Sequence, residues 1–351
     1  MDNSIQAHQK ELCNKLWAMA NALRGNMEAY EFKNYILGMI FYYYLSDRTE
    51  KYMANLLKDD GIGYEEAWAD EEYKTAVVEE ALRDLGYVIE PQYLFRKMVK
   101  MVENRSFDIE FLQSAINALM ESTIGNDSQE DFDGLFSDMQ LDSSKLGHTV
   151  KDRSAVMAKI IASLDEINFG VDDTKIDVLG NAYEYLIGEF AAGSGQKAGE
   201  FYTPQQLSSI LSGIVTLDTQ DPKSGMKKKL ERVLDFACGS GSLLLNVRHR
   251  MKANGGNIGK IYGQEKNITT YNLARMNMLL HGVKDSEFEI HHGDSLLNDW
   301  DMLNEMNPAK KVEFDAIVAN PPFSYRWEPT EEMGKDFRFN NYGLAPKSAA
   351  D

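Results

Sequence analysis

The tetrapeptide Asn320-Pro321-Pro322-Phe323 is the stretch whose residue types point most clearly to chemistry. It follows the run 314–319, which is short, apolar, β-branched and bounded by turn formers, and which therefore predicts a buried strand. Two prolines cannot continue a strand ladder, so the strand must end there and present Asn320 at its carboxyl edge. In open α/β sheets, this edge is where ligands bind.

The chemistry that this tetrapeptide offers is the orientation of an amino group on a planar ring. The side-chain carbonyl of Asn320 and the backbone carbonyl of Pro321 are two acceptors in a stiff loop, and Phe323 supplies an aromatic face. Two acceptors would hold the protons of the amine and leave its lone pair free to attack. The same residues would also serve as a simple proline turn, so the sequence upstream must decide between the two interpretations.

A predicted strand ending in Asp235 leads into a glycine-rich turn and then a helix. Gly239 and Gly241 allow the backbone to bend and to approach a ligand closely. A dinucleotide site would require a third glycine where this chain has Leu244, so a nicotinamide cofactor is disfavoured. The Asp-x-x-x-Gly-x-Gly spacing instead resembles the first motif of S-adenosylmethionine-dependent methyltransferases. A glycine turn of any Rossmann-like unit stays open as the alternative.

Two carboxylates follow the next predicted strands. Glu265 comes after the strand 258–263, roughly 20 residues beyond the glycine turn, where nucleotide sites hold a ribose through its hydroxyl groups. Asp294, after the third strand, would accept a hydrogen bond from an adenine amine. An ordinary surface Glu and a bare turn are the alternatives. His291 and His292 lack a third ligand at metal spacing, so we expect no metal site.

A capped helix start is predicted at residues 200–206, after the glycine-rich loop 191–199. Thr203 suits the N-cap, Pro204 the first helical position, and Gln206 the closing position of a capping box. The free amides and positive dipole end of this helix could meet a carboxylate of the cofactor. A well-capped helix without a ligand remains the alternative.

The 351 residues are enough for about two domains. Residues 1–150 are predicted to be helical, because apolar residues recur there at helical spacing and would form the core. Beyond residue 150, helices alternate with strands, which predicts a parallel sheet. We therefore expect an α/β protein with a helical domain over 1–150 and a Rossmann-like domain over 151–351. The elements expected are stripes at Leu16, Met19, Ala20, Leu23 and at Phe32, Ile36, Met39, Ile40, Tyr43; helices at 65–85, 93–102, 109–122, 152–164, 173–190, from 243, and at 269–281; a loop-rich boundary at 125–142; and strands near 233, 258–263, 288–291 and 314–318.

The composition bounds the cellular setting. A formal net charge of −18 should repel nucleic acid from the chain as a whole. If the substrate is DNA, we therefore expect a partner protein to provide much of the DNA-binding affinity. Two cysteines, Cys13 and Cys238, cannot build a disulfide framework or a zinc site, which favours a reducing cytosol. The most apolar stretch, 35–45, is too short to span a bilayer.

Four stretches, in order along the chain, resemble the modification (methyltransferase) subunit of type I restriction-modification systems, an adenine-specific DNA methyltransferase. The first resembles the helical N-terminal domain of that family, and the others resemble its cofactor-carboxylate motif, glycine loop and catalytic motif. They lie at residues 16–17 with 23–25 and 41–47, at 183–186 with 199–204, at 235–242, and at 320–323.

The resemblance implies methyl transfer from S-adenosylmethionine to the 6-amino group of an adenine flipped out of DNA. It also implies a separate specificity subunit and a restriction subunit as partners. A cytosine-C5 mechanism is disfavoured, because Phe323 stands where such enzymes place a cysteine. The implied catalytic residues are Asn320, Pro321, Pro322 and Phe323, and the implied cofactor-binding residues are Glu200, Phe201, Tyr202, Thr203, Pro204, Gln205, Asp235, Gly239, Ser240, Gly241, Ser242, Glu265 and Asp294.

The chain reaches Asp351 soon after the tetrapeptide, with four convincing strands, so we expect a methyltransferase domain truncated at its C-terminus. Two other functions stay open. The Asn-Pro-Pro-aromatic loop would also suit an amino group on RNA or protein, and the chain could instead be a non-catalytic interaction subunit whose helical domain is its working part. Labelled-methyl transfer and cofactor binding distinguish these three.

Overall fold

The computed structural model describes residues 3–23, 29–167, 176–193, 202–218, 225–297, 300, 302, 312–323 and 327–344. The chain divides into two compact units, residues 1–194 with 280–282 and residues 195–279 with 283–351, and each is described by itself. In the described ranges, every helix is too short or too polar to cross a membrane.

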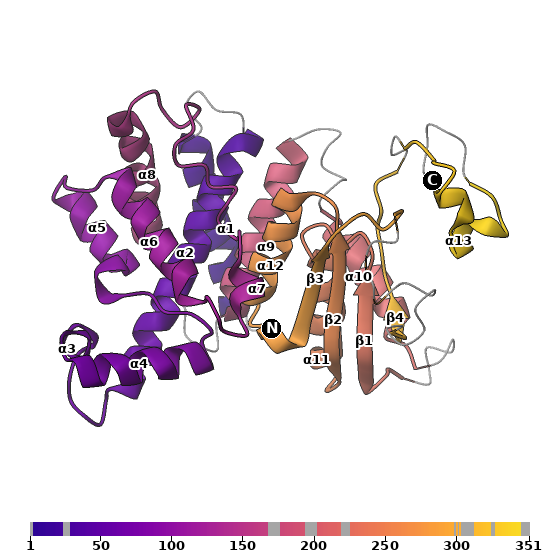
Figure 1. Cartoon of the computed structure of the whole chain (residues 1–351), viewed down its shortest axis with the longest axis horizontal. Coiled ribbons are helices and arrows are strands. Elements are labelled where there is room, and N and C mark those ends of the chain that lie inside the picture. The colour runs from indigo at the N-terminus through magenta and orange to yellow at the C-terminus, as the bar shows by residue number, and fades with distance from the viewer. Residues whose placement is uncertain are drawn as a thin grey trace. The chain divides into compact units, whose positions relative to one another are not determined.

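The first unit is helical and is built around the long helix α2 (Figure 1). Helices α8 and α9 pack against α1 and α2, and α8 also contacts α5 and α6. The predicted stripe of Phe32, Ile36, Met39, Ile40 and Tyr43 is confirmed as core at its first four positions, which are fully buried, whereas Tyr43 is half-buried. The helices are α1 Asn3–Leu23, α2 Ala29–Leu56, α3 Tyr64–Ala69, α4 Glu71–Asp84, α5 Phe95–Glu103, α6 Ile109–Ser122, α7 Gln129–Phe132, α8 Val150–Asp165 and α9 Ile176–Gly193, with a 3-10 turn at Pro91–Tyr93.

The single helix predicted over 65–85 is wrong, because Asp70 divides it into α3 and α4. The Asp70 backbone is extended, and its carboxylate accepts hydrogen bonds from the amides of Glu72 at 2.9 Å and Tyr73 at 3.2 Å. This is an N-cap, which satisfies amides that otherwise lack an intrahelical partner. The stretch 125–142, predicted as a loop-rich boundary, contains the short helix α7.

The second unit contains a four-stranded sheet in the order β3-β2-β1-β4, and every neighbouring pair is parallel. The strands lie side by side in Figure 1, and α11 packs on β1 and β2 while α10 packs on α11. The predicted parallel sheet is thus confirmed. The elements are α10 Gln205–Val215, β1 Lys229–Asp235, α11 Ser242–Ala253, β2 Asn257–Glu265, α12 Ile268–Leu280, β3 Phe288–His292, β4 Ala316–Ile317 and α13 Phe337–Asn340, with 3-10 turns at Asp285–Glu287 and Met333–Lys335.

Strand order reverses at β1. The chain passes from β1 to β2 and β3 on one side, and β4 then pairs with the other edge of β1, where Leu234 lies beside Ile317. The carboxyl ends of β1 and β4 therefore open onto the switch point at which doubly wound sheets bind their ligands.

Strand β4 is shorter than the predicted run 314–318. Phe314 lies outside the ladder and packs against the cluster of Leu234, Tyr262 and Trp300. Asp315 fastens the start of β4 to β1, because its Oδ2 accepts hydrogen bonds from the amides of Glu231 at 2.5 Å and Arg232 at 3.0 Å. The strand is thus held partly by a side chain, which its apolar pattern does not reveal.

We expect Asp315→Ala to lower the free energy of unfolding by about 1 to 3 kcal/mol, because two backbone amides of β1 lose a charged acceptor. Urea unfolding followed by circular dichroism measures the change. The matched control is Glu313→Ala, an exposed carboxylate two residues away, which should stay within about 0.5 kcal/mol of wild type. Equal stabilities of the two variants would contradict the role given to Asp315.

Candidate active site

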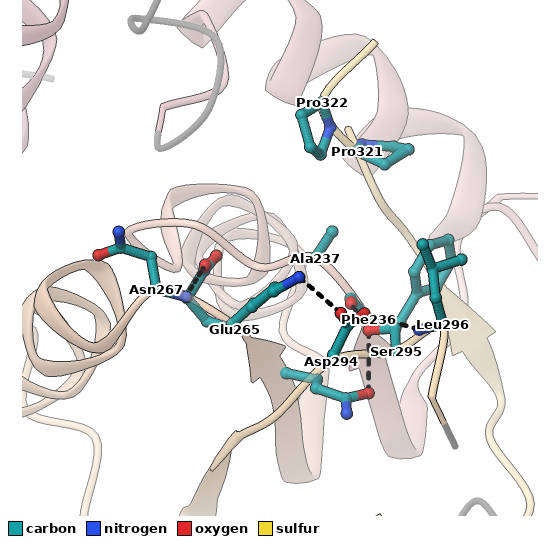
Figure 2. Close-up of a pocket in the computed structure, with 11 residues that line it drawn as sticks. Phe236, Ala237, Glu265, Asn267, Asp294, Ser295, Leu296, Pro321 and Pro322 are labelled. Atoms are coloured by element: carbon teal, nitrogen blue, oxygen red, sulfur yellow. Dashed lines mark hydrogen bonds and ion pairs between the residues drawn. The ribbon is translucent and has the colours of Figure 1, made fainter. Parts of the chain in front are cut away.

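One cavity of about 410 Å³ lies at the carboxyl edge of the sheet. Figure 2 shows Glu265, Asp294 and Pro322 around this space, so the segments that follow β2, β3 and β4 contribute to one wall. The cavity is lined by Phe236, Ala237, Gln264, Glu265, Lys266, Asn267, Asp294, Ser295, Leu296, Pro321 and Pro322. Four strand ends that are far apart in the sequence thus meet at one pocket.

Glu265 joins the end of β2 to the glycine turn. Its Oε2 accepts a hydrogen bond from the amide of Gly239 at 3.1 Å, and its Oε1 accepts one from the amide of Asn267 at 2.8 Å. Burial raises the pKa of Glu265 above its ordinary value, and hydrogen bonds from the backbone amides of Asn267, Gly239 and Lys266 oppose that rise. These three amide donors leave one lone pair of the carboxylate for a ligand hydroxyl group.

The glycine turn adopts the backbone that its sequence predicts. Gly239 has φ +54° and Gly241 has φ +77°, in the left-handed region that favours glycine. A Cβ on Gly241 would also lie 2.8 Å from Cε of the buried Met278. The hydroxyl groups of Ser240 and Ser242 are buried and lie 3.1 Å apart. Of the turn, Phe236 and Ala237 line the cavity, and residues 239–242 are not among its lining residues.

Asp235 lies beneath the pocket, with 1% of its surface exposed. Its Oδ1 accepts a hydrogen bond from the amide of Ala237 at 3.0 Å, which supports the turn that follows β1. Burial raises the pKa of Asp235 to about 7; the hydrogen bond from Ala237 lowers it, and the negative charge of Glu265 raises it further. This carboxyl group is therefore poised between its two protonation states near neutral pH.

Asp294 lines the pocket on the side of β3. Its Oδ1 accepts a hydrogen bond from the amide of Leu296 at 3.0 Å, and its Oδ2 lies 2.7 Å from Nζ of Lys266. The dashed line in Figure 2 that ends at Asp294 from the side of Glu265 marks this ion pair. The Asp294 side chain keeps 17% exposure, so a ligand in the pocket can reach it.

The tetrapeptide lies at the end of β4 beside the start of α10. Pro321 and Pro322 line the pocket, and the side chain of Asn320 is half-buried. Nδ2 of Asn320 donates to Oγ1 of Thr203 over 3.4 Å, a bond that joins the two predicted motifs. Phe323 is 80% exposed, so its ring faces solvent.

The N-cap role predicted for Thr203 is wrong. Helix α10 begins at Gln205, and its N-cap is Pro204, which was predicted at the first helical position. No side chain caps the helix, so the predicted capping box with Gln206 is wrong as well. Thr203 instead accepts the hydrogen bond from Asn320, and Gln205 exchanges hydrogen bonds with the side chain of Asn246 at 3.0 and 3.3 Å. Tyr202 and Pro204 complete the described part of the motif. Glu200 and Phe201 lie outside the described residues.

Seven lining residues were not predicted from the sequence. Each lies close to the end of a strand and within two residues of a predicted residue, so the strand boundaries carried the signal that could have found them. Ser295 is an example: its hydroxyl group lies within hydrogen-bond distance of the backbone oxygen of Phe236 and of Oε1 of Gln264, the latter at 3.0 Å. The seven are Phe236, Ala237, Gln264, Lys266, Asn267, Ser295 and Leu296. In the described ranges, His, Cys, Asp and Glu side chains form no group of three or more that could hold a metal ion.

Two family models match this chain. The model described as N-6 DNA Methylase matches residues 174–351, and the model of the HsdM N-terminal domain matches residues 12–164.

The chain is also similar to individual proteins. It is 34% identical to the type I restriction enzyme MpnII methylase subunit of Mycoplasma pneumoniae, over 96% of this chain and 63% of that protein. It is 28% identical to the MjaIX methylase subunit of Methanocaldococcus jannaschii, over 90% of this chain and 51% of that protein. A crystal structure of a type I restriction-modification methyltransferase subunit from Streptococcus thermophilus matches with a TM-score of 0.82 and 34% identity, over 98% of this chain and 70% of that one. The chain thus spans about half to two thirds of the curated relatives.

We expect Asp235→Asn to reveal a pH-dependent contribution to stability. The pKa of Asp235 in the folded chain is about 7, above the value near 4 of an unfolded Asp, so the folded state binds more protons between these values. The contribution of Asp235 to the free energy of unfolding therefore falls as pH rises from about 4 to 7. Urea unfolding at several pH values should show the wild-type-minus-variant difference falling over that range and levelling off above about pH 8.

The control is Asp336→Asn. The guanidinium of Arg338 holds the pKa of Asp336 below its ordinary value, so the corresponding difference should be flat above about pH 5. A flat difference for Asp235→Asn as well would show that the buried carboxyl group does not titrate near neutral pH.

Proposed function

We propose that this chain, which belongs to the N-6 DNA methylase family, transfers a methyl group from S-adenosylmethionine to the 6-amino group of adenine in DNA. The observation that carries the proposal is a single pocket lined by Glu265, Asp294 and the prolines of the Asn-Pro-Pro-Phe tetrapeptide. A nucleoside-binding wall and an amine-orienting loop are thereby adjacent, as methyl transfer requires. Because the chain spans about half to two thirds of its curated relatives, we also propose that the whole protein has this activity.

The lining residues fit S-adenosylmethionine by their chemistry. Its ribose hydroxyl groups need an acceptor such as Glu265, its adenine amine needs one such as Asp294, and its positive sulfonium suits a wall with two carboxylates. Phe236 and Leu296 supply apolar surface for a planar ring. When bound, the cofactor supplies an electrophilic methyl group. We also propose that residues 200–205 bind the carboxylate end of the cofactor. Asp235 and residues 239–242 make the other contacts with the cofactor.

The catalytic residues act by orienting the target amine. Oδ1 of Asn320 and the carbonyl oxygen of Pro321 accept hydrogen bonds from the two N–H groups of the amine. The lone pair of the amine is thereby directed toward the methyl group. Because Nδ2 of Asn320 donates to Thr203, Oδ1 is the atom left for the substrate. The exposed ring of Phe323 replaces part of the stacking that an adenine loses when it leaves the helix. The nitrogen gains the methyl group and releases one proton.

We further propose that the chain acts as the modification subunit of a type I restriction-modification complex, with a specificity subunit and a restriction subunit in the cytosol. The net charge of −18 supports this assembly, because an acidic chain needs a partner to hold DNA phosphates. We propose that residues 1–150 form a helical domain that contacts these partners or DNA, and that residues 151–351 carry methyl transfer. Helices α8 and α9 nevertheless pack within the first compact unit, which extends to residue 194.

We expect Asn320→Ala to lower the rate of methyl transfer to DNA by at least about 10²-fold, the scale seen when one oriented polar group leaves an active site. Binding of S-adenosylmethionine should stay within about twofold, because Asn320 is not among the residues that line the cofactor pocket. Transfer of a labelled methyl group by the assembled complex measures the rate, and isothermal titration calorimetry measures cofactor binding.

The matched control is Asn254→Ala, an exposed asparagine in the turn after α11. It should methylate DNA at the wild-type rate. Retention of full activity by Asn320→Ala would reject the catalytic role. Equal transfer to RNA or protein by the wild-type complex would reject the DNA substrate.

A further inference from the structure

The loop that follows β3 forms one wall of the pocket through Asp294, Ser295 and Leu296. The hydroxyl group of Ser295 holds the loop, because its one proton is shared between the backbone oxygen of Phe236 and Oε1 of Gln264. The backbone carbonyl oxygens of Ser295 and Leu296 are used differently. Both accept hydrogen bonds from a residue more than 40 positions further along the chain.

That residue is Arg338, in the short helix α13. Nη1 of Arg338 donates to the carbonyl oxygen of Ser295 over 2.6 Å, and Nη2 donates to that of Leu296 over 3.1 Å. On its other edge the guanidinium makes a two-pronged ion pair with Asp336, with Nε–Oδ1 at 3.0 Å and Nη2–Oδ2 at 2.8 Å. One planar cation thus connects two carbonyl oxygens of the pocket wall to a carboxylate.

The segment that carries Arg338 comes directly after the catalytic tetrapeptide in the chain. Its described part, 327–344, is anchored by the buried side chains of Trp327 and Met333, and Trp327 packs against the ring of Phe339 at 6.4 Å between centroids. Arg338 is 28% exposed, so the bridge is partly shielded from water and from screening by salt.

We propose that Arg338 is a positioning residue that fixes the loop after β3, and with it the carboxylate of Asp294, in the geometry that selects adenine. This inference rests on the proposed function, because it assumes that Asp294 accepts from the adenine amine. It adds a link between the two halves of the reaction: the segment that follows the amine-orienting tetrapeptide holds the wall that binds the cofactor.

The geometry of the guanidinium makes the proposal specific. Its N–H groups are fixed in one plane and serve three acceptors at once, whereas the ammonium of a lysine is a compact point charge that cannot span them. Arg338→Lys keeps the charge but should lose the bridge, and Arg338→Ala loses both.

The test compares two ligands of the full chain by isothermal titration calorimetry. S-Adenosylhomocysteine carries the adenine amine, and S-inosylhomocysteine carries a carbonyl oxygen in its place. We expect wild type to prefer the adenosyl ligand, and both Arg338 variants to lose about tenfold of that preference, the scale of one hydrogen bond. The matched control is Arg83→Ala in α4, which removes an arginine that pairs with Glu80 and Asp84 in the first unit and is not a lining residue of the pocket. It should keep the preference of wild type.

Hydrogen–deuterium exchange of the ligand-free chain supplies a readout that does not depend on the proposed function. The amides of Gly293, Leu296 and Leu297 are hydrogen-bonded within the loop or to β2, so releasing the loop should speed their exchange in both Arg338 variants. Failure of wild type to bind either ligand would reject the proposed function, while exchange would still decide the role of Arg338.

Three results would overturn the inference. Unchanged exchange of residues 293–297 in Arg338→Ala would show that the bridge does not hold the loop. An equal loss of affinity for both ligands would show that Arg338 stabilises the pocket without contributing to the preference for adenine. Wild-type behaviour of Arg338→Lys would show that only the charge matters.

Discussion

Parallel pairing of β1 with a neighbour on each side is the constraint on which the rest of the structure depends. Because all strands run in one direction, the turns that follow β1, β2, β3 and β4 meet at one edge. Side chains from positions 236 to 322 are thereby brought around one cavity. The reversal of strand order at β1 leaves the crevice open between β1 and β4, beside the tetrapeptide.

Hydrogen bonds across this edge bind the turns to one another. The glycine turn is fastened to the end of β2 through Glu265, and the end of β4 is fastened to the start of α10 through Asn320 and Thr203. The same edge concentrates negative charge: burial raises the pKa of both Asp235 and Glu265, and the charge of Glu265 raises the pKa of Asp235 further. A cationic ligand would relieve this repulsion, which agrees with a sulfonium cofactor.

The features predicted correctly from the sequence are those with a local cause. Short apolar runs located the strands, and a strand's end located Asp235, Glu265 and Asn320 at the carboxyl edge. Gly239 and Gly241 were predicted to let the turn bend, and both have a positive φ. The family suggested by four motifs in order is confirmed by the family models.

The features that were missed have causes far away in the chain. Thr203 and Asn320 are 117 residues apart, so local capping rules could not show that the threonine would bind an asparagine in place of α10. Asp315 fixes a strand of two residues through the amides of β1, and Arg338 holds a loop 43 residues earlier. Such bonds between side chains and distant backbone have no periodic signal in the sequence.

The proposed activity of the pocket and the adjacent tetrapeptide is the methylation of adenine in DNA. Single-molecule sequencing can compare genomic DNA from source cells that carry the intact locus with DNA from cells that carry Asn320→Ala at equal protein levels. We expect N6-methyladenine to disappear from one defined sequence in the variant cells. An unchanged methylation map, with the protein expressed in both strains, would contradict it.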